Sequence, residues 1–475
     1  MDPGLKIITF EESKSCDSLT MKMEGMHPHD LMDRATLRIF QRLKTLIHCD
    51  TPITVLCGPG DNGADGLCLS SMLAVKGYHV ETKICLLGKN PAPSIAFRLA
   101  LYGSQKSINI QVVRKAEELT IQQKHLVIDA LFGTGLTRPL RDEWQKIIES
   151  INGSGAEIIS IDLPSGLLDE PINETMSFIK ASKVITIQSP KPALLYPENR
   201  IDFEVIDCGI HAESIHCRRF FLDNGISVRE QMKTLLPKRP RHSHKGTFGH
   251  TLLIGGNTGM HGAISMAAKT CYDSGSGLTT VLSPETTVPY LASLPAVMHI
   301  PCSLAKTSLS KINPEKYQSV AIGPGLGNTA ETTDLLKAIL NMFRIPVIVD
   351  ADALNIIAAN PELLYLLPKG SLLTPHPTEF NRLFGSTQNG KEKELLAIQK
   401  SQEFDMFILA KNTYSFLACP DGKIFYNGTG DSGLARGGSG DRLTGMIAGL
   451  FAQNQNMRDS ALAGMYFSGL NQPVI

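Results

Sequence analysis

The chain has 475 residues, and its 46 lysines and arginines balance 46 aspartates and glutamates, so the formal net charge is zero. This balance argues against a protein that coats nucleic acid or an acidic membrane, because both need a surplus of positive charge. A hydrophobic content of 42% excludes an intrinsically disordered chain. Since domains usually have about 100–200 residues, the length predicts two domains, or at most three.

The cysteines and the first residues predict a cytoplasmic protein. The ten cysteines are scattered and include no C-x-x-C pair, so neither a zinc knuckle nor a disulfide framework is indicated. The opening MDPGLKIITFEES contains acidic residues and no apolar segment typical of a secretion signal. No run of about 18 apolar residues predicts a membrane span. Zinc is not expected, because His244, His261 and His299 lack partners at metal-ligand spacing.

The first half of the chain predicts a helix and then alternating strands and helices. Residues 24–48 fit a helix, with Leu31, Ala35 and Ile39 on one stripe. Short, nearly continuous apolar runs follow, each ending in a turn: ITVLCGPG, HVETKICLL, HLVIDALFG, AEIISIDLPSG and KVITIQSP. Such alternation is typical of a parallel sheet buried on both faces. We therefore predict a doubly wound α/β domain over residues 1–222.

The second half predicts a further α/β domain. The stretch from residue 211 to 245 is polar and basic with little periodicity, so we expect the domain junction near residues 220–230. The alternation then resumes with TLLIGG, GAISMAAKTCYDSG, LTTVLSP, SVAIGPGLG, IPVIVDADALN, SLLTPH and MFILAK, and with a last helix after Gly440. We predict a second doubly wound domain over residues 223–475.

Three strand ends in the first half combine glycines with oxygen-bearing side chains. They hold Asp61, Asn62 and Asp65 in CGPGDNGADG, Asp129 in IDALFGTGL, and Asp162 and Ser165 in IDLPSG. Ligands of open parallel sheets bind at the carboxyl ends of the strands, and a glycine turn before a helix favours a phosphate-like anion. Neither a G-x-G-x-x-G fingerprint nor a P-loop occurs. Each turn taken alone could still be an ordinary strand-to-helix connection.

The side chains at these strand ends suggest specific roles. Asn62, Asp129 and Ser165 are hard oxygen donors that suit a weakly bound alkali or alkaline-earth cation. Asp162, beside a turn fixed by proline, is the candidate general acid or base. An aspartate before Pro-Ser-Gly could instead cap a helix.

The glycine-rich stretch GTGDSGLARGGSGDRLTGMIAGL predicts an anion cradle over a carboxylate in the second half. Glycines precede Asp441, which falls in the first turn of a predicted helix. Backbone N–H groups there would hold charge on a transferred phosphoryl group, and Asp441 could take a proton from an attacking hydroxyl. The alternative is that Asp441 only complements the helix dipole. Asp350, Asp352 and His376 follow nearby strands, and His376 is either a substrate contact or a loop histidine.

In combination, the motifs resemble those of the bifunctional NAD(P)H-hydrate repair enzymes. LMDRA, GPGDNGADGL, VIDALFGTGL and IDLPSGL match the epimerase motifs in order, and HKGTFGHTLLIGG, IGPGLG, VDADALN, LTPHPTEFNRL and GGSGDRLTG match the dehydratase motifs. The resemblance covers nearly the whole chain. It implies a Rossmann-like three-layer first domain, an isomerase that interconverts the R and S forms of hydrated NADH or NADPH. It implies a ribokinase-like second domain, a lyase that dehydrates the S form with ADP or ATP as phosphoryl donor.

The resemblance also assigns residues to roles. In the first domain it implies Asp162 as catalytic, potassium ligands Asn62, Asp129 and Ser165, and hydrate contacts Asp61, Asn62, Gly63, Ala64, Asp65, Gly133, Thr134, Gly135, Leu136, Thr137, Arg138 and Pro139. In the second it implies Asp441 as catalytic base, hydrate contacts Ala263, Gly327 and His376, and nucleotide contacts Lys411, Asn412, Thr413, Tyr414, Ser415, Gly438, Ser439 and Gly440. The implied cofactors are K⁺ in the first domain and ADP or ATP with Mg²⁺ in the second. A homo-oligomer is expected.

The chain departs from the family pattern at a few positions. Asp61 and Ala64 replace the usual asparagine and glycine, so Ala64 would place a Cβ in a turn expected to need positive φ. Asn412 replaces a glycine, and GDSGLAR brings an added cation, Arg436. Two other interpretations stay open: a ribokinase-like small-molecule kinase, and a nucleotide-binding protein that has lost one or both activities. The sequence does not choose between ADP and ATP, nor between the NADH and NADPH hydrates.

Overall fold

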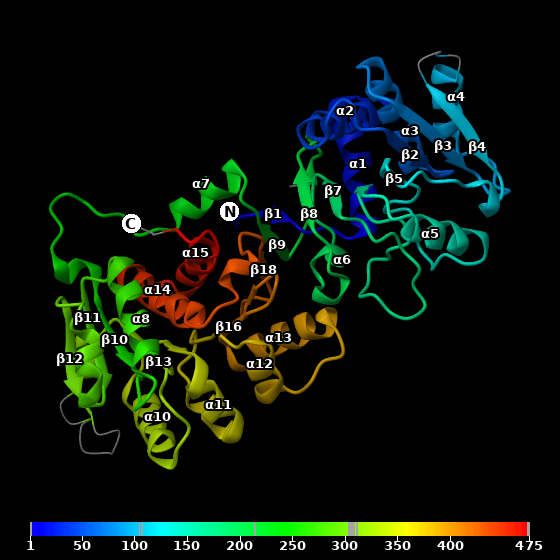
Figure 1. Ribbon diagram of the computed structural model, residues 1–475. Coiled ribbons are helices and arrows are strands. Elements are labelled where there is room, and N and C mark those ends of the chain that lie inside the picture. The colour runs from blue at the N-terminus through cyan, green and yellow to red at the C-terminus, as the bar shows by residue number, and fades with distance from the viewer. Residues whose placement is uncertain are drawn as a thin grey trace. The chain divides into compact units, whose positions relative to one another are not determined.

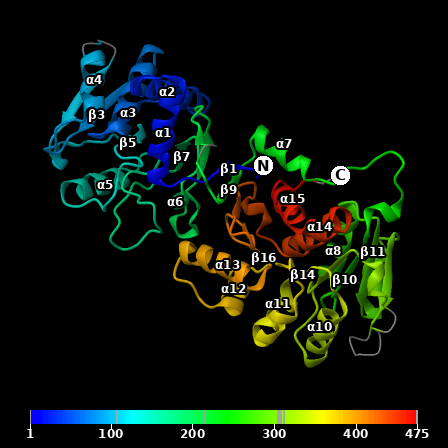
Figure 2. The same cartoon turned by 180° about the vertical axis from the view of Figure 1, so that it is seen from behind.

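A computed structural model describes residues 2–103, 105, 108–212, 215–302, 309 and 312–472. The chain divides into two compact units, one from Lys6 to Cys217 and the other from Arg218 onward together with the residues before Lys6 (Figures 1 and 2). The division falls before the expected junction because Arg219–Leu222 is a strand of the second unit. The stretch from 211 to 245 therefore has more regular structure than its polar composition predicted.

The N-terminal domain is built on a parallel sheet with strand order β4-β3-β2-β5-β6-β7-β8. These strands are β2 (Ile53–Cys57), β3 (Val80–Cys85), β4 (Asn109–Val113), β5 (Leu126–Ala130), β6 (Ile158–Ile161), β7 (Lys183–Ile187) and β8 (Phe203–Ile206). The chain builds outward from β2 through β3 to β4 and then returns to place β5 on the other side of β2. The carboxyl ends of β2 and β5 thus form a topological switch point, where doubly wound sheets bind ligands.

Helices cover both faces of this sheet, which confirms the predicted three-layer α/β architecture. They are α1 (Phe10–Glu24), α2 (Pro28–Leu46), α3 (Asp61–Val75), α4 (Pro93–Tyr102), α5 (Glu143–Gly153) and α6 (Pro192–Leu195). On one face, Leu43 of α2 and Leu67 of α3 belong to a core cluster with sheet residues. On the other face, Trp144 and Ile147 of α5 belong to a second cluster.

The predicted helix over residues 24–48 corresponds to α2, but α1 before it was not predicted. Gly25, in a left-handed conformation with φ of +65°, separates the two helices. Thr9 begins α1 through a capping box with Glu12. Its sequence FEESKSCDSLTMKME carries few apolar residues, so tertiary contacts rather than an apolar stripe fix this helix.

The C-terminal domain has a larger mixed sheet with strand order β1-β9-β18-β17-β16-β15-β14-β13-β10-β11-β12. The strands are β1 (Leu5–Lys6), β9 (Arg219–Leu222), β10 (His250–Ile254), β11 (Leu278–Ser283), β12 (Val297–Pro301), β13 (Ser319–Ile322), β14 (Val347–Val349), β15 (Leu372–Leu373), β16 (Phe407–Ala410), β17 (Phe416–Ala418) and β18 (Ile424–Asn427). Strands β10 to β16 pair in parallel, whereas β17 is antiparallel to both of its neighbours. The predicted second doubly wound domain is confirmed.

The helices of this domain pack around the sheet. They are α7 (Ile226–Thr234), α8 (His261–Asp273), α9 (Val288–Leu291), α10 (Ala330–Met342), α11 (Ala351–Ala359), α12 (Pro377–Phe384), α13 (Gly390–Phe404), α14 (Ser439–Asn454) and α15 (Met457–Gly469). The central helix α14 is buried along most of its length and shares one core cluster with α8 and α15. This packing fixes the glycine-rich N-terminus of α14 beside the sheet.

Within the described residues, no helix combines the length and apolarity that a membrane crossing requires.

The first residues of the chain belong to the C-terminal domain. The Asp2 carboxylate pairs with Arg458 and, at 3.1 Å, with Lys423. The Gly4 amide donates a hydrogen bond of 2.9 Å to the Gln231 side chain, and β1 extends the sheet beside β9. The N-terminal segment is therefore an edge strand of the domain that is last in sequence.

We expect Asp2→Ala to destabilise only the C-terminal domain, by about 1 kcal/mol, because two partly buried ion pairs are lost. The single tryptophan, Trp144, lies in the N-terminal domain. Tryptophan fluorescence during urea unfolding should therefore keep its midpoint, while the far-UV circular dichroism transition of the other domain moves to lower urea. Glu315→Ala, at an exposed position of the same domain, is the control. A shift of the fluorescence midpoint by Asp2→Ala would contradict the assignment.

Candidate active sites

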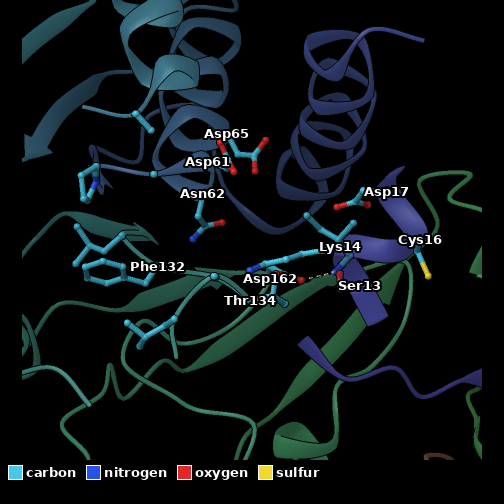
Figure 3. A pocket seen from close by; sticks show the side chains of 18 of the residues that line it. Ser13, Lys14, Cys16, Asp17, Asp61, Asn62, Asp65, Phe132, Thr134 and Asp162 are labelled. Carbon is cyan, nitrogen blue, oxygen red and sulfur yellow. Dashed lines mark hydrogen bonds between the residues drawn. The ribbon is translucent and has the colours of Figure 1, made fainter. Parts of the chain in front are cut away.

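A cavity of about 500 Å³ lies at the topological switch point of the N-terminal domain. Its lining includes residues that follow β2, β3, β5 and β6, together with residues of α1 (Figure 3). Asp61, Asn62 and Asp65 project into it from the start of α3, and Asp162 from the end of β6. The structure thus brings together the polar residues that the sequence placed at three separate strand ends.

The turn before α3 is shaped by a close backbone approach. A Cβ at Gly63 would lie 2.0 Å from the carbonyl oxygen of Gly58, so only glycine fits there. Ala64 is buried within α3 and its φ is not positive, so the expectation of a strained Cβ at this position is wrong. The physical reason is that the motif forms the first helical turn rather than a loop. Gly63 and Ala64 are buried, while their neighbours line the cavity.

Asp162 is held by a buried lysine. Its Oδ1 accepts a hydrogen bond of 2.5 Å from Nζ of Lys191, whose side chain is 1% exposed. Lys191 also donates to Oγ1 of Thr186 and to the carbonyl of Ile187, both at 3.0 Å. Asp162 itself has a left-handed backbone with φ of +65°, a conformation that costs energy in a non-glycine residue and that gathers at functional sites. No helix begins after it, which excludes the helix-cap alternative.

The second oxygen of Asp162 faces the glycine loop after β5. A Cβ added to Gly133 would lie 3.4 Å from Oδ2 of Asp162 and 3.4 Å from Cγ of Asn62. The Asn62 amide nitrogen is buried and has no hydrogen-bond partner among the described residues. The side chains of Asp162 and Asn62 therefore approach the same loop of the cavity, and the amide nitrogen of Asn62 is left available to a ligand.

The three predicted cation ligands lie around the same loop. Asp129 is fully buried and accepts hydrogen bonds from the Ser165 hydroxyl at 2.5 Å and from the Ser160 hydroxyl at 2.7 Å. Burial raises the pKa of Asp129, and the hydrogen bonds from Ser165 and Ser160 oppose this rise. The Ser165 hydroxyl also bonds the backbone of Phe132, next to Gly133 and Asn62. The carboxylate, hydroxyl and carbonyl oxygens form a set of hard donors that suits an alkali cation.

The predicted hydrate contacts after β5 divide into two groups. Gly133, Thr134, Gly135 and Leu136 line the cavity, whereas Thr137, Arg138 and Pro139 do not. Sequence reasoning missed Lys191 and the whole contribution of α1. The only signal for Lys191 was a lysine within the otherwise apolar PKPALL, and α1 carried no motif.

The candidate site of the C-terminal domain is organised by a buried ion pair. Asp350 follows β14, is 1% exposed and accepts hydrogen bonds of 2.6 Å from Nζ of Lys411 and from the Thr444 hydroxyl. Burial alone would raise the pKa of Asp350, but Lys411 and the hydrogen bonds from Thr444 and Thr374 hold it below its ordinary value. A Cβ at Gly440 would lie 3.2 Å from the Lys411 ammonium, which therefore sits at the N-terminus of α14.

That N-terminus has the features of an anion cradle. Gly438 caps α14 with φ of +89°, and a Cβ on it would meet Met266 at 2.5 Å, so glycine is required. No side chain caps the helix, which leaves N–H groups of its first turn available to a ligand. Lys411 adds a positive charge beside them. The predicted position of Asp441 in the first turn of the helix is confirmed.

Asp441 combines burial with nearby negative charge. Burial first, and then the charges of Asp350 and Asp352, raise the pKa of Asp441 to about 6, although Lys411 opposes them. A carboxylate with such a pKa is ionised at neutral pH and basic enough to accept a proton. Asp352 accepts a hydrogen bond of 2.8 Å from the amide of Gly327, a predicted hydrate contact.

His376 caps α12 rather than standing free in a loop. Its Nδ1 accepts from the amide of Thr378 at 3.1 Å, so the proton of a neutral ring lies on Nε2, which faces Glu379 at 3.2 Å. Burial, followed by the Lys411 charge, lowers the pKa of His376. Burial raises the pKa of Glu379 to about 7. Nothing in the sequence distinguished Glu379. Its contact with His376 and its raised pKa become visible only in the folded structure.

The other predicted nucleotide contacts lie between β16 and β17. Asn412 and Ser415 close this connection. The Ser415 hydroxyl accepts a hydrogen bond from the backbone N–H of Asn412 at 3.2 Å and donates one to the backbone carbonyl of Asn412 at 3.1 Å. Asn412 shows no positive φ, so the glycine usual in the family is not required by this backbone. Thr413 is exposed, and Ala263 lies in the first turn of α8.

Comparisons with known proteins match two families to different parts of the chain. Residues 28–193 match the family of the YjeF-related protein N-terminus, and residues 251–471 match NAD(P)H-hydrate dehydratase. Over 95% of its length the chain is 31% identical to the bifunctional NAD(P)H-hydrate repair enzyme Nnr of Escherichia coli, 86% of which is covered. The chain belongs to the bifunctional NAD(P)H-hydrate repair enzymes. The predicted family is thereby confirmed.

The chain is also similar to a second Nnr enzyme and to a solved dehydratase. The Nnr enzyme of Coxiella burnetii is 31% identical over 94% of the chain and 90% of its own length. Among solved structures, an ADP/ATP-dependent NAD(P)H-hydrate dehydratase from Bacillus subtilis, co-crystallised with ATP and Mg²⁺, shares 31% identity. That match covers 50% of this chain and 85% of the dehydratase, with a TM-score of 0.45.

Proposed function

We propose that this chain repairs hydrated nicotinamide nucleotides, with an epimerase site in the N-terminal domain and a nucleotide-dependent dehydratase site in the C-terminal domain. The observation that carries the proposal is Asp441, a carboxylate with a pKa of about 6 in the first turn of an uncapped helix beside Lys411. The family membership of the whole chain supports the pairing of both activities in one protein.

The dehydratase step follows from the charges at α14. Asp441 takes the proton of the hydrate hydroxyl, whose oxygen attacks the terminal phosphorus of ADP or ATP. The N–H groups of Gly438–Gly440 and the Lys411 ammonium hold the transferred phosphoryl group. Phosphate then leaves with the electron pair of the C–O bond, and loss of a ring proton restores the double bond of the reduced nicotinamide. When bound with the nucleotide, Mg²⁺ would neutralise phosphate charge.

In the epimerase site, Asp162 is the acid–base group, and the unused amide nitrogen of Asn62 donates a hydrogen bond to the substrate while its side-chain oxygen faces the cation. We also infer a K⁺ ion held by Asp129, Ser165 and Asn62, which is supported by the set of oxygen donors around Phe132. Ten free cysteines favour a reducing compartment, and we propose the cytoplasm. Homo-oligomer formation stays a prediction, which light scattering after gel filtration tests.

The function is tested with chemically hydrated NADH, which contains both epimers, and the full chain. With ATP or ADP present, the absorbance of reduced nicotinamide should recover in a fast phase, from the S form, and then a slower phase limited by epimerisation. Without nucleotide no recovery should occur. Absence of any recovery with both nucleotides would contradict the proposal, and an accumulating phosphorylated product without phosphate release would favour a small-molecule kinase.

The potassium site makes a separate prediction. Exchange of K⁺ for a large organic cation such as choline should slow the second phase at least about tenfold, because choline cannot enter a site of hard oxygen donors. The first phase should not change in the same buffer. Ser165→Ala should slow the second phase in K⁺ as well. Equal second-phase rates of wild type in K⁺ and choline would exclude a K⁺ role.

Arg436 is expected to contact the nucleotide phosphates. It lies two residues before Gly438, is exposed, and lines a smaller cavity of about 180 Å³ with Ser439 and Arg442. Arg436→Ala should raise the Kd for ATP about threefold to tenfold at low salt, and the difference should shrink as salt screens the charge. Titration calorimetry at two salt concentrations measures this, with the exposed Arg344→Ala as control. An unchanged Kd at low salt would contradict the contact.

A further inference from the structure

Helix α1 forms a wall of the epimerase cavity, although it lies outside the matched family region of residues 28–193. Cys16 and Thr20 face the domain core, and the Thr20 hydroxyl accepts a hydrogen bond of 2.9 Å from the His211 amide. Asp17 lies on a neighbouring face of the helix, and it lines the cavity together with Ser13, Lys14 and Cys16 (Figure 3).

Asp17 differs from the other carboxylates of the cavity in its hydrogen bonding. Asp61 accepts from the Ser94 hydroxyl at 2.7 Å, Asp65 from the Thr36 hydroxyl at 3.4 Å, and Asp162 from Lys191. The Asp17 carboxylate has no hydrogen-bond partner in the described part of the chain. A partly buried carboxylate that no protein group engages is free to bond a substrate hydroxyl.

The surroundings of Asp17 give it a titration range suited to proton transfer. Burial first, and then the charge of Asp162, raise the pKa of Asp17 to about 6; Lys191 lowers it and Asp61 raises it further. At neutral pH a fraction of Asp17 therefore carries a proton. Asp162, in contrast, is paired with the Lys191 ammonium. Two carboxylates in different environments on one cavity are the arrangement expected of an acid and a base.

We propose that Asp17 is a second catalytic acid–base residue of the epimerase, acting with Asp162 from another wall of the cavity. The inference rests on the proposed function. In hydrated NADH the hydroxyl is on a ring carbon bonded to the ring nitrogen. Asp17 donates a proton to this hydroxyl, the C–O bond breaks with its electron pair leaving in water, and the nitrogen lone pair forms a C=N bond.

A water molecule then adds to the other face of the same carbon. Its oxygen forms the new C–O bond, the C=N electrons return to nitrogen, and Asp162 accepts the proton that the water loses. No atom is oxidised or reduced. Run in the opposite direction, the two carboxylates exchange roles, as the interconversion of two epimers requires.

The experiment uses the full chain carrying Asp441→Asn, so that hydrate is not consumed by dehydration. One hydrate epimer is incubated in ¹⁸O-labelled water, and the epimer ratio and ¹⁸O content of the hydrate are followed by chromatography with mass spectrometry. We expect interconversion accompanied by ¹⁸O uptake. Adding Asp17→Asn should reduce the rates of interconversion and of ¹⁸O uptake by about 100-fold or more. Asp17→Glu keeps the carboxylate, so it should reduce these rates less than about tenfold.

Glu11→Gln on the exposed side of α1 is the control and should match the parent. Trp144 fluorescence during urea unfolding shows whether each variant retains a folded N-terminal domain. If the parent interconverts the epimers and Asp17→Asn does so equally fast, the role of Asp17 is overturned while the proposed function stands. Interconversion without ¹⁸O uptake would overturn the C–O cleavage step. A parent that interconverts nothing would refute the epimerase function itself.

Discussion

Asp441→Asn should lower kcat for nucleotide-dependent dehydration about 10²–10⁴-fold, the range expected when a general base is removed. The amide cannot accept the hydroxyl proton, but it keeps the shape of the side chain in the first turn of α14. The Kd for ATP should stay within about threefold of the wild-type value, because the phosphate cradle consists of backbone N–H groups and Lys411.

The same carboxylate predicts the pH dependence. A base must be ionised to act, so kcat/KM of the dehydratase should rise with pH through about 6, the pKa of Asp441, and level off above it. Glu379, whose pKa is about 7, adds a second inflection if its charge affects binding. In Asp441→Asn the rise through pH 6 should vanish from the residual activity.

The measurement is the recovery of reduced nicotinamide absorbance from the S hydrate with saturating ATP, and calorimetry supplies the Kd. Glu315→Gln, an exposed residue of the same domain, should leave both quantities unchanged. Dehydration by Asp441→Asn at the wild-type rate would rule out the base assignment and leave Asp441 as a complement to the helix dipole.

Lys191→Met should lower the free energy of unfolding of the N-terminal domain by about 3–5 kcal/mol and abolish epimerase activity. The substitution leaves the buried Asp162 carboxylate without its cation, and an uncompensated buried charge is costly. The loss should appear as a lower midpoint in the urea unfolding followed by Trp144 fluorescence. Lys124→Met removes an exposed lysine of the same domain and should leave that midpoint unchanged.

A double variant separates stability from catalysis. In Lys191→Met with Asp162→Asn, neither charge remains, so most of the lost stability should return, while epimerisation should stay absent because the acid–base group is gone. The first, fast phase of nucleotide-dependent recovery belongs to the other domain and should persist in all the variants at Lys191, Asp162 and Lys124. A double variant as unstable as Lys191→Met would show that packing, not charge pairing, gives Lys191 its importance.

The sequence predicted the features that depend on local order along the chain. Apolar runs such as ITVLC and LVIDA place strands because their hydrophobic residues are contiguous, and a parallel sheet carries its ligands at the carboxyl ends of those strands. Asp162 could be identified for this reason, and Asp441 from the glycines that precede a predicted helix. The resemblance then supplied the family, which the relatives confirm.

Contacts between segments that are far apart along the chain could not be predicted from the sequence. Lys191 is 29 positions from Asp162 along the chain. Burial first, and then the charges of Asp350 and Asp352, raise the pKa of Glu379, and both causes arise only after α12 is packed. Helix α1 carries neither motif nor strong apolar stripe, so its place on the cavity could not be predicted. The first residues of the chain likewise join the domain that is last in sequence.

By itself, then, the sequence determined the alternating strands and helices of both domains and the carboxylates at the strand ends, because these follow from periodicity and from neighbours along the chain. The tertiary structure alone decided how those carboxylates are charged. At the strand ends, Lys191 pairs with Asp162 and Lys411 pairs with Asp350. On helices, Asp441 and the unpredicted Asp17 are left partly buried beside other negative charges. Charge states depend on burial and on partners brought from far along the chain, and only folding sets both.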